Sequence, residues 1–297
     1  MKIIAKERDT LVAGGEVWLV QPEHIDDVLR VCITSKREPS ATERFGAVLA
    51  TDAELSAGAL ISTIRSSSIG FDLPPLFAVS IGYPLDATPP FALRRNRDLT
   101  PTAWPAFEAA TPALTGLSER MSTGGSEAFL AFLLDELLPA LADAYRLDPE
   151  DVTLTGQSFG GLFVLDALLR RPGRFRRYLA VSPSLWWDDG ALLRAAERTV
   201  ATSPSPSARV YMCVGELENT ARFGAQLAQV PESMKPLVPS AMTKVDMAGD
   251  MFLIDQTLRR WASDSFSVEA HVYPEESHES IMGAAFSRGL RRLYGTL

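Results

Sequence analysis

Residues Gly156 to Gly160 form the motif G-x-S-x-G, with Ser158 at its centre. The stretch before the motif, D-V-T-L-T, is rich in β-branched residues and is typical of a buried strand. The stretch after it, G-L-F-V-L-D-A-L-L-R-R, has the apolar spacing of a helix, which Pro172 ends. A strand, a sharp glycine turn and a helix predict a nucleophile elbow, whose strained turn exposes a serine hydroxyl at the tip of a sheet. Ser158 is therefore the predicted nucleophile.

A serine hydroxyl needs a neighbouring base, and the chain has 3 histidines. The chain order of elbow hydrolases is nucleophile, acid, histidine, which excludes His24. His271 lies inside the alternating run S-V-E-A-H-V-Y-P, typical of a last strand, and is interpreted as a strand residue packed against a neighbour. His278 follows that strand in P-E-E-S-H-E-S-I, where this fold delivers its base, so we predict His278 as the base. The alternative for His278 is a solvated loop residue.

The acid should follow the strand A-R-V-Y-M-C-V-G, which ends at Gly215. Glu218 is the predicted acid, because hydrolases of this fold often place it about three residues past a glycine that closes this strand. Glu216 is the alternative, although an extended backbone would turn it to the opposite side. An exposed loop charge is the ordinary interpretation of either glutamate. A dyad without an acid, or an acid from elsewhere, also stays open, with Asp246, Asp250 and Asp255 as candidates.

An oxyanion hole needs two backbone N–H groups aimed at the developing negative oxygen. The residue after the nucleophile, Phe159, should supply the first. The second comes from the loop after the third strand of the common core. The apolar run L-F-A-V-S-I opens into G-Y-P, so we predict that Tyr83 supplies this donor. An ordinary turn before Pro84 is the alternative.

Strands alternate with helices along the chain, which predicts an α/β-hydrolase fold with a mostly parallel, doubly wound sheet and helices on both faces. We expect one domain over 1–297, with a small cap or lid at 221–249, where Pro and Met interrupt the pattern. Pro84 to Met121 lacks periodicity and is predicted to be a long functional loop. The other predicted strands are 15–21, 28–34, 45–51, 76–81 and 178–181, and the predicted helices are 54–65, 125–146, 190–198, 251–262 and 281–294.

The 297 residues are 46% hydrophobic and carry a formal charge of −8, enough for a large buried core and unfavourable for binding nucleic acid. No apolar run reaches ~18 residues and no long apolar segment opens the chain, so we expect no membrane span, no signal peptide and a cytoplasmic location. Cys32 and Cys213 each lie in an apolar strand and are predicted to be buried small hydrophobes. We expect no metal and no cofactor, and the sequence predicts no oligomeric state.

Six segments occur in the order of one family: I-G-Y-P, R-R-N-R-D-L-T-P, G-Q-S-F-G-G, S-P-S-L-W-W, V-G-E-L-E and S-H-E-S-I. From Gly15 to the C-terminus the chain resembles the putative-esterase branch of the α/β-hydrolases, most closely the enterobactin and bacillibactin esterases, which act on trilactone siderophores. The elbow alone is generic, whereas the combination of R-R-x-x-D-L-T-P, S-P-S-x-W-W and H-E-S is specific. The chain differs after the predicted strand 45–51, where T-D-A replaces the family's common aspartate–glycine pair.

The resemblance implies a serine esterase in which Ser158 and His278 carry the catalysis; some members of the family use this dyad alone. It also implies a small-molecule ester substrate such as an iron–siderophore with anionic catecholates. Arg95 and Arg97 are candidates to bind those oxygens, and Trp186 is a candidate wall of the acyl pocket. The structural alternatives are an ion pair between Arg95 and Asp98 and a tryptophan buried in the core.

Three other functions stay open. An acyltransferase or a general carboxylesterase of the same fold would use the same residues, with an alcohol replacing water in the acyltransferase. A non-catalytic binding protein with a hydrolase fold belongs to a different class. The presence of a serine, a carboxylate and a histidine in the expected order weighs against it.

Overall fold

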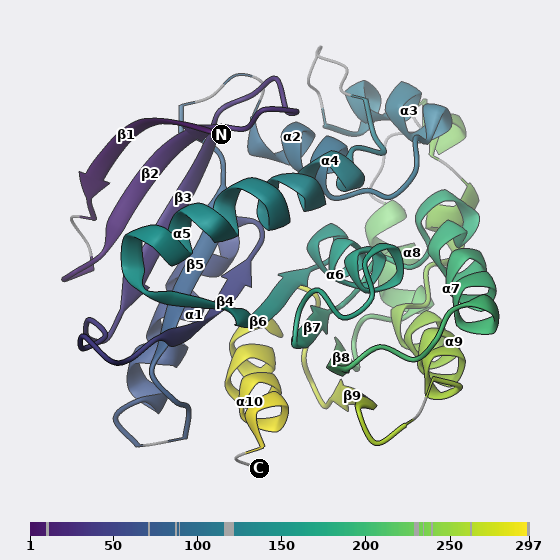
Figure 1. Ribbon diagram of the computed structural model, residues 1–297. Coiled ribbons are helices and arrows are strands. Elements are labelled where there is room, and N and C mark those ends of the chain that lie inside the picture. The colour runs from purple at the N-terminus through teal and green to yellow at the C-terminus, as the bar shows by residue number, and fades with distance from the viewer. Residues whose placement is uncertain are drawn as a thin grey trace.

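The computed structural model describes residues 1–9, 12–70, 72–86, 88, 90–115, 122–228, 232–233, 235–238, 240–261 and 263–295. A nine-stranded sheet with the order β1-β2-β3-β5-β4-β6-β7-β8-β9 forms its centre (Figure 1). The strands are β1 (Lys2–Arg8), β2 (Glu16–Gln21), β3 (Leu29–Ser35), β4 (Phe45–Ala50), β5 (Leu76–Gly82), β6 (Leu147–Gln157), β7 (Arg177–Val181), β8 (Ala208–Gly215) and β9 (Phe266–Tyr273).

Most of the sheet is parallel. The pairs β5/β4, β4/β6, β6/β7, β7/β8 and β8/β9 run parallel, and the pairs among β1, β2, β3 and β5 run antiparallel. The carboxyl ends of β4, β6, β7, β8 and β9 therefore meet at one edge, which is where α/β folds of this kind place their sites. β1 is a strand that the sequence pattern does not predict, because it is an exposed edge strand without an apolar face.

Helices cover both faces of the sheet, which confirms the predicted doubly wound architecture. α1 and α10 pack against each other on one face, and α4 to α7 and α9 contribute to the apolar cluster on the other. The helices are α1 (Ala53–Ser67), α2 (Phe91–Asp98), α3 (Pro105–Thr115), α4 (Ser126–Ala131), the π-helical η1 (Phe132–Leu137), α5 (Leu138–Tyr145), α6 (Phe159–Arg170), η2 (Trp187–Asp189), α7 (Ala191–Thr202), α8 (Thr220–Leu227), η3 (Lys235–Leu237), η4 (Ser240–Lys244), α9 (Met247–Arg259) and α10 (Met282–Tyr294).

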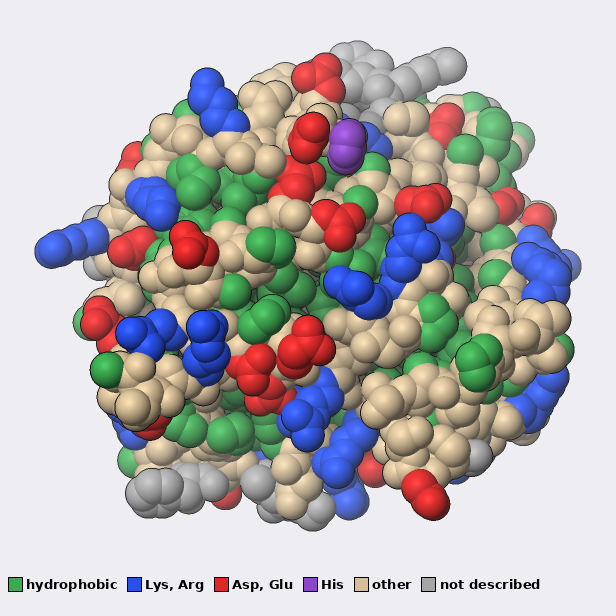
Figure 2. All heavy atoms as spheres, in the orientation of Figure 1, with side chains coloured by type: hydrophobic (Ala, Val, Ile, Leu, Met, Phe, Trp, Pro, Cys, Tyr) green, Lys and Arg blue, Asp and Glu red, His purple; other side chains and the backbone are tan. Residues whose placement is uncertain are grey.

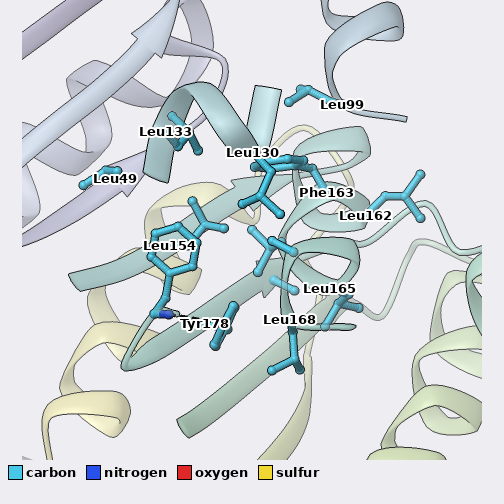
Figure 3. Close-up of a cluster of buried hydrophobic side chains, with 14 of the residues drawn as sticks. Leu49, Leu99, Leu130, Leu133, Leu154, Leu162, Phe163, Leu165, Leu168 and Tyr178 are labelled. Carbon is cyan, nitrogen blue, oxygen red and sulfur yellow. Dashed lines mark hydrogen bonds between the residues drawn. The ribbon is translucent and has the colours of Figure 1, made fainter. Parts of the chain in front are cut away.

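The helix after the elbow, α6, lies in the centre of the core. Its residues from Phe159 to Leu169 are all buried, as expected for a helix that is apolar on most sides. Figure 3 shows Phe163 and Leu165 of this helix among side chains that include Leu154 of β6 and Tyr178 of β7. This packing fixes the start of α6, and with it the turn that carries Ser158.

The segment from Pro84 to Met121 differs from its prediction as a loop. Its described residues form α2 and α3, which Figure 1 shows with α4 at the top of the molecule. α2 lacks apolar periodicity because its buried residues include Arg94 and Asp98, and α3 contains Pro112. Both features hide a helix from pattern-based prediction.

Two other predicted segments have mixed outcomes. The helix predicted over 125–146 is present as the run α4, η1 and α5, with a π-helical turn in its middle. The described part of 221–249 holds short helices, α8, η3 and η4, and its role as a lid stays a prediction. Among the described residues, no helix has both the length and the hydropathy that a membrane span requires.

Candidate active site

The elbow has the geometry that its sequence predicts. Ser158 joins β6 to α6 with φ 63° and ψ −118°, a conformation that side chains rarely adopt. The backbone N–H of Ser158 donates to the Val181 carbonyl at 3.0 Å, which ties the turn to β7. A Cβ atom at Gly156 would lie 2.5 Å from Thr51 Oγ1 and 2.7 Å from the Gly160 carbonyl carbon. Glycine is therefore required where the strand, the helix and the end of β4 meet.

Glu218 and His278 lie against each other at the ends of β8 and β9. Glu218 Oε2 is 2.6 Å from His278 Nδ1, and the glutamate side chain is fully buried. Its other oxygen, Oε1, accepts hydrogen bonds from Ser182 Oγ at 2.6 Å and from the Gly215 N–H at 2.7 Å. A carboxylate at this position suits the tautomer of His278 that carries its proton on Nδ1, and in that tautomer the Nε2 lone pair can accept another proton.

The two loops that carry this pair are joined by hydrogen bonds. The Glu218 N–H donates to the Gly215 carbonyl at 3.1 Å, and the resulting turn returns the side chain toward the sheet. The Gln157 side chain donates to the His278 carbonyl. Glu216 instead accepts from the Glu275 N–H at 3.0 Å and is exposed, so it braces the loop away from the imidazole.

The segment S-P-S after β7 contributes two contacts that the sequence pattern does not reveal. Ser182 is fully buried at φ 43°, and its hydroxyl donates to Glu218. Ser184 Oγ is 3.3 Å from Ser158 Oγ. Both serines belong to the S-P-S-L-W-W motif. The motif alone does not indicate which side chains form hydrogen bonds with them.

Ser158 and His278 line one cavity of about 560 Å³. Among the described residues, Ser184 is the hydrogen-bond partner of the Ser158 hydroxyl, and no hydrogen bond joins Ser158 to His278. Catalytic contacts are often loose before substrate binds. The other residues around the cavity are Asp52, Leu55, Phe91, Ala92, Arg95, Asn96, Gln157, Glu279 and Met282.

His271 lies elsewhere, within β9. Its ring packs edge-on against Tyr273 with the centroids 4.7 Å apart, and its buried Nε2 has no hydrogen-bond partner in the described part of the chain. Burial and the nearby Arg288 charge lower the pKa of His271, which favours the neutral ring. The strand interpretation therefore matches its place in the fold.

The predicted oxyanion donors have different outcomes. Phe159 begins α6 beside Ser158, and its backbone N–H has no acceptor within the described residues. The prediction for Tyr83 is wrong, because its N–H donates to Glu54 Oε1 at 2.6 Å. Tyr83 also follows β5, whereas the strand next to β6 is β4. The sheet order thus separates Tyr83 from the elbow by one strand.

The turn after β4 occupies the position expected for the second donor. Thr51 Oγ1 lies against the elbow glycines, and Asp52, next in the chain, has φ 56° and ψ 57°. This left-handed residue opens α1. In the described chain, the N–H groups of Asp52 and Ala53 have no acceptor. In the sequence, T-D-A stands out only as a difference from the family. It does not indicate that this turn borders the site.

The arginines of α2 are held by carboxylates inside the protein. Arg95 Nε and Nη2 donate to the two Asp52 carboxylate oxygens at 2.7 and 2.9 Å, a bidentate pair that is largely buried. Burial works to lower the pKa of Arg95, but the Asp52 charge and hydrogen bonds outweigh it and raise that pKa. Arg97 bonds to Asp98 at 2.7 and 2.8 Å and is not among the residues that border the cavity, so its contact with substrate stays a prediction.

Trp186 lies in an aromatic cluster behind the elbow. Its ring centroid is 5.9 Å from that of Phe159 and 6.3 Å from that of Trp104. It is partly buried, packs against the core and is not among the residues that border the cavity, so its role as a wall of the acyl pocket stays a prediction. Its ring contact helps to hold the Phe159 side chain in place.

Comparison with known proteins identifies relatives of this chain. The family model described as "Putative esterase" matches residues 116–238. The siderophore triacetylfusarinine C esterase of Aspergillus fumigatus is 30% identical over 222 residues, which cover 73% of this chain and 70% of that protein. The ferri-bacillibactin esterase BesA of Bacillus subtilis is 27% identical over 212 residues, covering 70% of this chain and 72% of that protein.

A solved structure extends the likeness over nearly the whole fold. The BES protein from Bacillus cereus superimposes with a TM-score of 0.75 at 21% identity, covering 97% of this chain and 98% of that one. This level of identity supports the fold alone, whereas the fungal esterase is similar enough over most of its length to show the family. The chain therefore belongs to the putative-esterase family of ester hydrolases with an α/β-hydrolase fold.

Proposed function

We propose that this protein is a serine esterase that cleaves carboxylic esters of siderophores through an acyl-enzyme. One observation carries the proposal: the buried Glu218 carboxylate holds His278 Nδ1 at 2.6 Å, and His278 borders the same cavity as the elbow serine. An acid, a base and a nucleophile are thereby gathered from three separate strand ends around a space that can hold an ester.

In the first half of the reaction, Ser158 Oγ attacks the ester carbonyl carbon, and its proton passes to His278 Nε2. The hydroxyl must first turn from Ser184 toward His278, a rotation about one single bond. His278 becomes an imidazolium, which the Glu218 carboxylate stabilises across Nδ1. When the intermediate collapses, His278 returns the proton to the leaving alcohol.

The negative oxygen of the tetrahedral intermediate needs donors already in place. The Phe159 N–H supplies one, and the turn at Asp52 and Ala53 supplies the other. Arg95 links these groups: it binds the Asp52 carboxylate, donates to the Gln157 carbonyl at 3.4 Å, and lies 5.2 Å from the Phe159 ring centroid. In this proposal Arg95 positions the oxyanion hole and does not bind substrate directly.

In the second half, His278 removes a proton from water, and the resulting hydroxide attacks the acyl-enzyme carbonyl. Collapse of this second intermediate returns the proton to Ser158 and releases the carboxylic acid. The substrate class comes from relatives named as esterases of ferri-bacillibactin and triacetylfusarinine C. The two relatives come from different organisms and are named for different siderophores, but both names specify an esterase.

The function is tested by incubating the protein with ester-linked siderophores of both kinds, with and without iron, and analysing the products by mass spectrometry. We expect masses that increase by one water for each ester cleaved. A fluorophosphonate should abolish the reaction by labelling a serine. Turnover of simple esters such as p-nitrophenyl butyrate without any siderophore cleavage would favour a general carboxylesterase, and release of mixed esters in the presence of an alcohol would favour an acyltransferase.

Glu218→Gln should lower kcat by roughly 10²- to 10⁴-fold with little change in KM, because an amide cannot fix the imidazole tautomer or stabilise the imidazolium. Steady-state kinetics with p-nitrophenyl butyrate measures this loss. Glu216→Gln is the matched control and should cost less than about tenfold, since its carboxylate bonds to the loop backbone. Near-normal activity in both variants, with folding checked by circular dichroism, would point to a Ser158–His278 dyad.

Arg95→Lys should lower kcat by roughly 10- to 100-fold while the KM for an uncharged ester stays nearly constant, because a point charge cannot hold Asp52 in two places. Arg97→Lys is the control, because its partners Asp98 and Asp27 lie outside the cavity lining. We expect its kcat within about threefold of the wild type. A rise in KM confined to anionic esters in Arg95→Lys would instead restore the predicted role in substrate binding.

A further inference from the structure

The described residues that line the cavity beside Ser158 include more carboxylates than cationic side chains. Arg95 is its one positive side chain among the described lining residues, and both oxygens of Asp52 occupy its guanidinium. Glu279 adds a further carboxylate, whose side chain is 62% exposed. Ser277 donates a hydrogen bond to it and lowers the pKa of Glu279, so it stays negative at neutral pH.

Neighbouring arginines do not correct this balance. Arg94 binds Asp27, and Arg97 binds Asp98 and Asp27, all away from the cavity lining. Arg222 lies 3.8 Å from Glu279, but both side chains are exposed, so water screens this pair, and Arg222 is not among the lining residues. On the face of the molecule seen in Figure 2, Lys and Arg side chains are interspersed with Asp and Glu side chains. An anionic group that entered the cavity would meet no unpaired cation among its described lining residues.

The remaining lining offers apolar contacts. Leu55 is 59% exposed although it borders a cavity, and Phe91, Ala92 and Met282 lie around the same space. Exposed apolar side chains in a concavity are a common feature of ligand sites, because a ligand can cover them. An anion placed there would lose its hydration without a compensating charge, whereas an uncharged segment would lose little.

From the paired arginine, the surplus carboxylate and the apolar wall, we propose that the substrate segment which enters the Ser158 cavity is uncharged. This inference rests on the proposed function and deepens it: the cavity takes the neutral ester backbone of a substrate, and any anionic group of that substrate stays outside. It replaces the expectation that arginines of this region bind catecholate oxygens. Glu279 is the residue that we infer to exclude negative charge.

The test compares matched ester pairs that differ by one charge. One pair places the charge in the acyl arm, as p-nitrophenyl esters of monomethyl adipate and of adipate. The other places it in the alcohol arm, as butyrates of 4-hydroxybenzamide and of 4-hydroxybenzenesulfonate. We expect the neutral member to have a kcat/KM at least about tenfold higher in one pair or both. Equal turnover, or a preference for the anion in both pairs, would overturn the proposal.

Glu279→Gln should narrow this preference by roughly two- to fivefold, the size of an effect from one exposed charge at low salt. The readout is the ratio of kcat/KM values within a pair, so a general effect on His278 cancels. Glu275→Gln removes the same charge from the same loop outside the lining and should leave the ratio unchanged. A ratio that Glu279→Gln does not move, or that Glu275→Gln moves equally, would contradict the role given to Glu279.

Binding to the Ser158→Ala variant separates this inference from the proposed function. Calorimetric titration with the same four esters reports the charge preference without turnover. A neutral preference in binding supports the inference even if the wild type hydrolyses none of them, a result that would count against the esterase proposal alone. Equal binding of neutral and anionic members would overturn the inference whatever the turnover.

Discussion

Ser158→Ala should lower kcat for p-nitrophenyl butyrate by about 10⁴- to 10⁶-fold, because removing the nucleophile disables the catalytic group as a unit. The expected residual rate comes from the proposed oxyanion donors at Phe159 and the Asp52 turn, which this substitution leaves in place. Single-turnover kinetics at high enzyme concentration can measure a rate this low. In the wild type, a fluorophosphonate adduct should map to Ser158 by peptide mass spectrometry, and an adduct on any other residue would refute the assignment.

The stability of two variants at this position gives an independent check on the elbow. Ser158→Ala should change the free energy of unfolding by well under about 2 kcal/mol, since the lost hydroxyl has one long hydrogen bond, at 3.3 Å to Ser184. In Ser158→Gly the free energy of unfolding should be higher than in Ser158→Ala by about 1 kcal/mol or more, because glycine relieves the backbone strain at φ 63°. Urea denaturation compares the two. A glycine variant less stable than the alanine variant would mean that the turn is not strained.

His278→Ala should cost nearly as much in kcat as Ser158→Ala, because an unactivated serine hydroxyl is a weak nucleophile. The double variant should be little slower than either single one, since the two side chains act as one unit. Strong additivity, with the double variant slower by the product of both effects, would show that His278 works independently of Ser158.

His271→Ala is the matched control for this prediction. Most activity should remain, because His271 packs against Tyr273 within β9 and does not border the cavity. Its free energy of unfolding should fall by no more than about 2 kcal/mol, the range for losing one partly buried ring contact. If His271→Ala abolished activity while His278→Ala kept it, the base would have to be reassigned to β9.

Local chain features predict the turn and the two loops that carry the candidate residues. The elbow could be predicted because its glycines, its preceding β-branched run and its following apolar helix are consecutive in the sequence. Glu218 was distinguishable from Glu216 because a turn after Gly215 depends on a few adjacent residues. His278 was distinguishable from His271 because the alternation of the last strand ends between them.

Local sequence patterns do not predict contacts between distant parts of the chain. The sequence does not show which acid each arginine of α2 will meet, and Arg95 reaches Asp52 across 43 positions of the chain. The α2 helix itself has no apolar periodicity in the sequence, because its buried positions include charged residues that ion pairs satisfy. The serines at 182 and 184 likewise acquired partners only when β7 was placed between β6 and β8.

By itself, the sequence determined the fold class, most of the elements and the chain order of the candidate serine, glutamate and histidine, because turn chemistry and apolar periodicity act over short stretches of chain. The tertiary structure alone decided which strand borders the elbow. β4 precedes β5 in the chain but lies between β5 and β6 in the sheet, so the turn at Asp52, and not Tyr83, lies against the elbow glycines. Strand order is set by the packing of the whole core, and no local pattern encodes it.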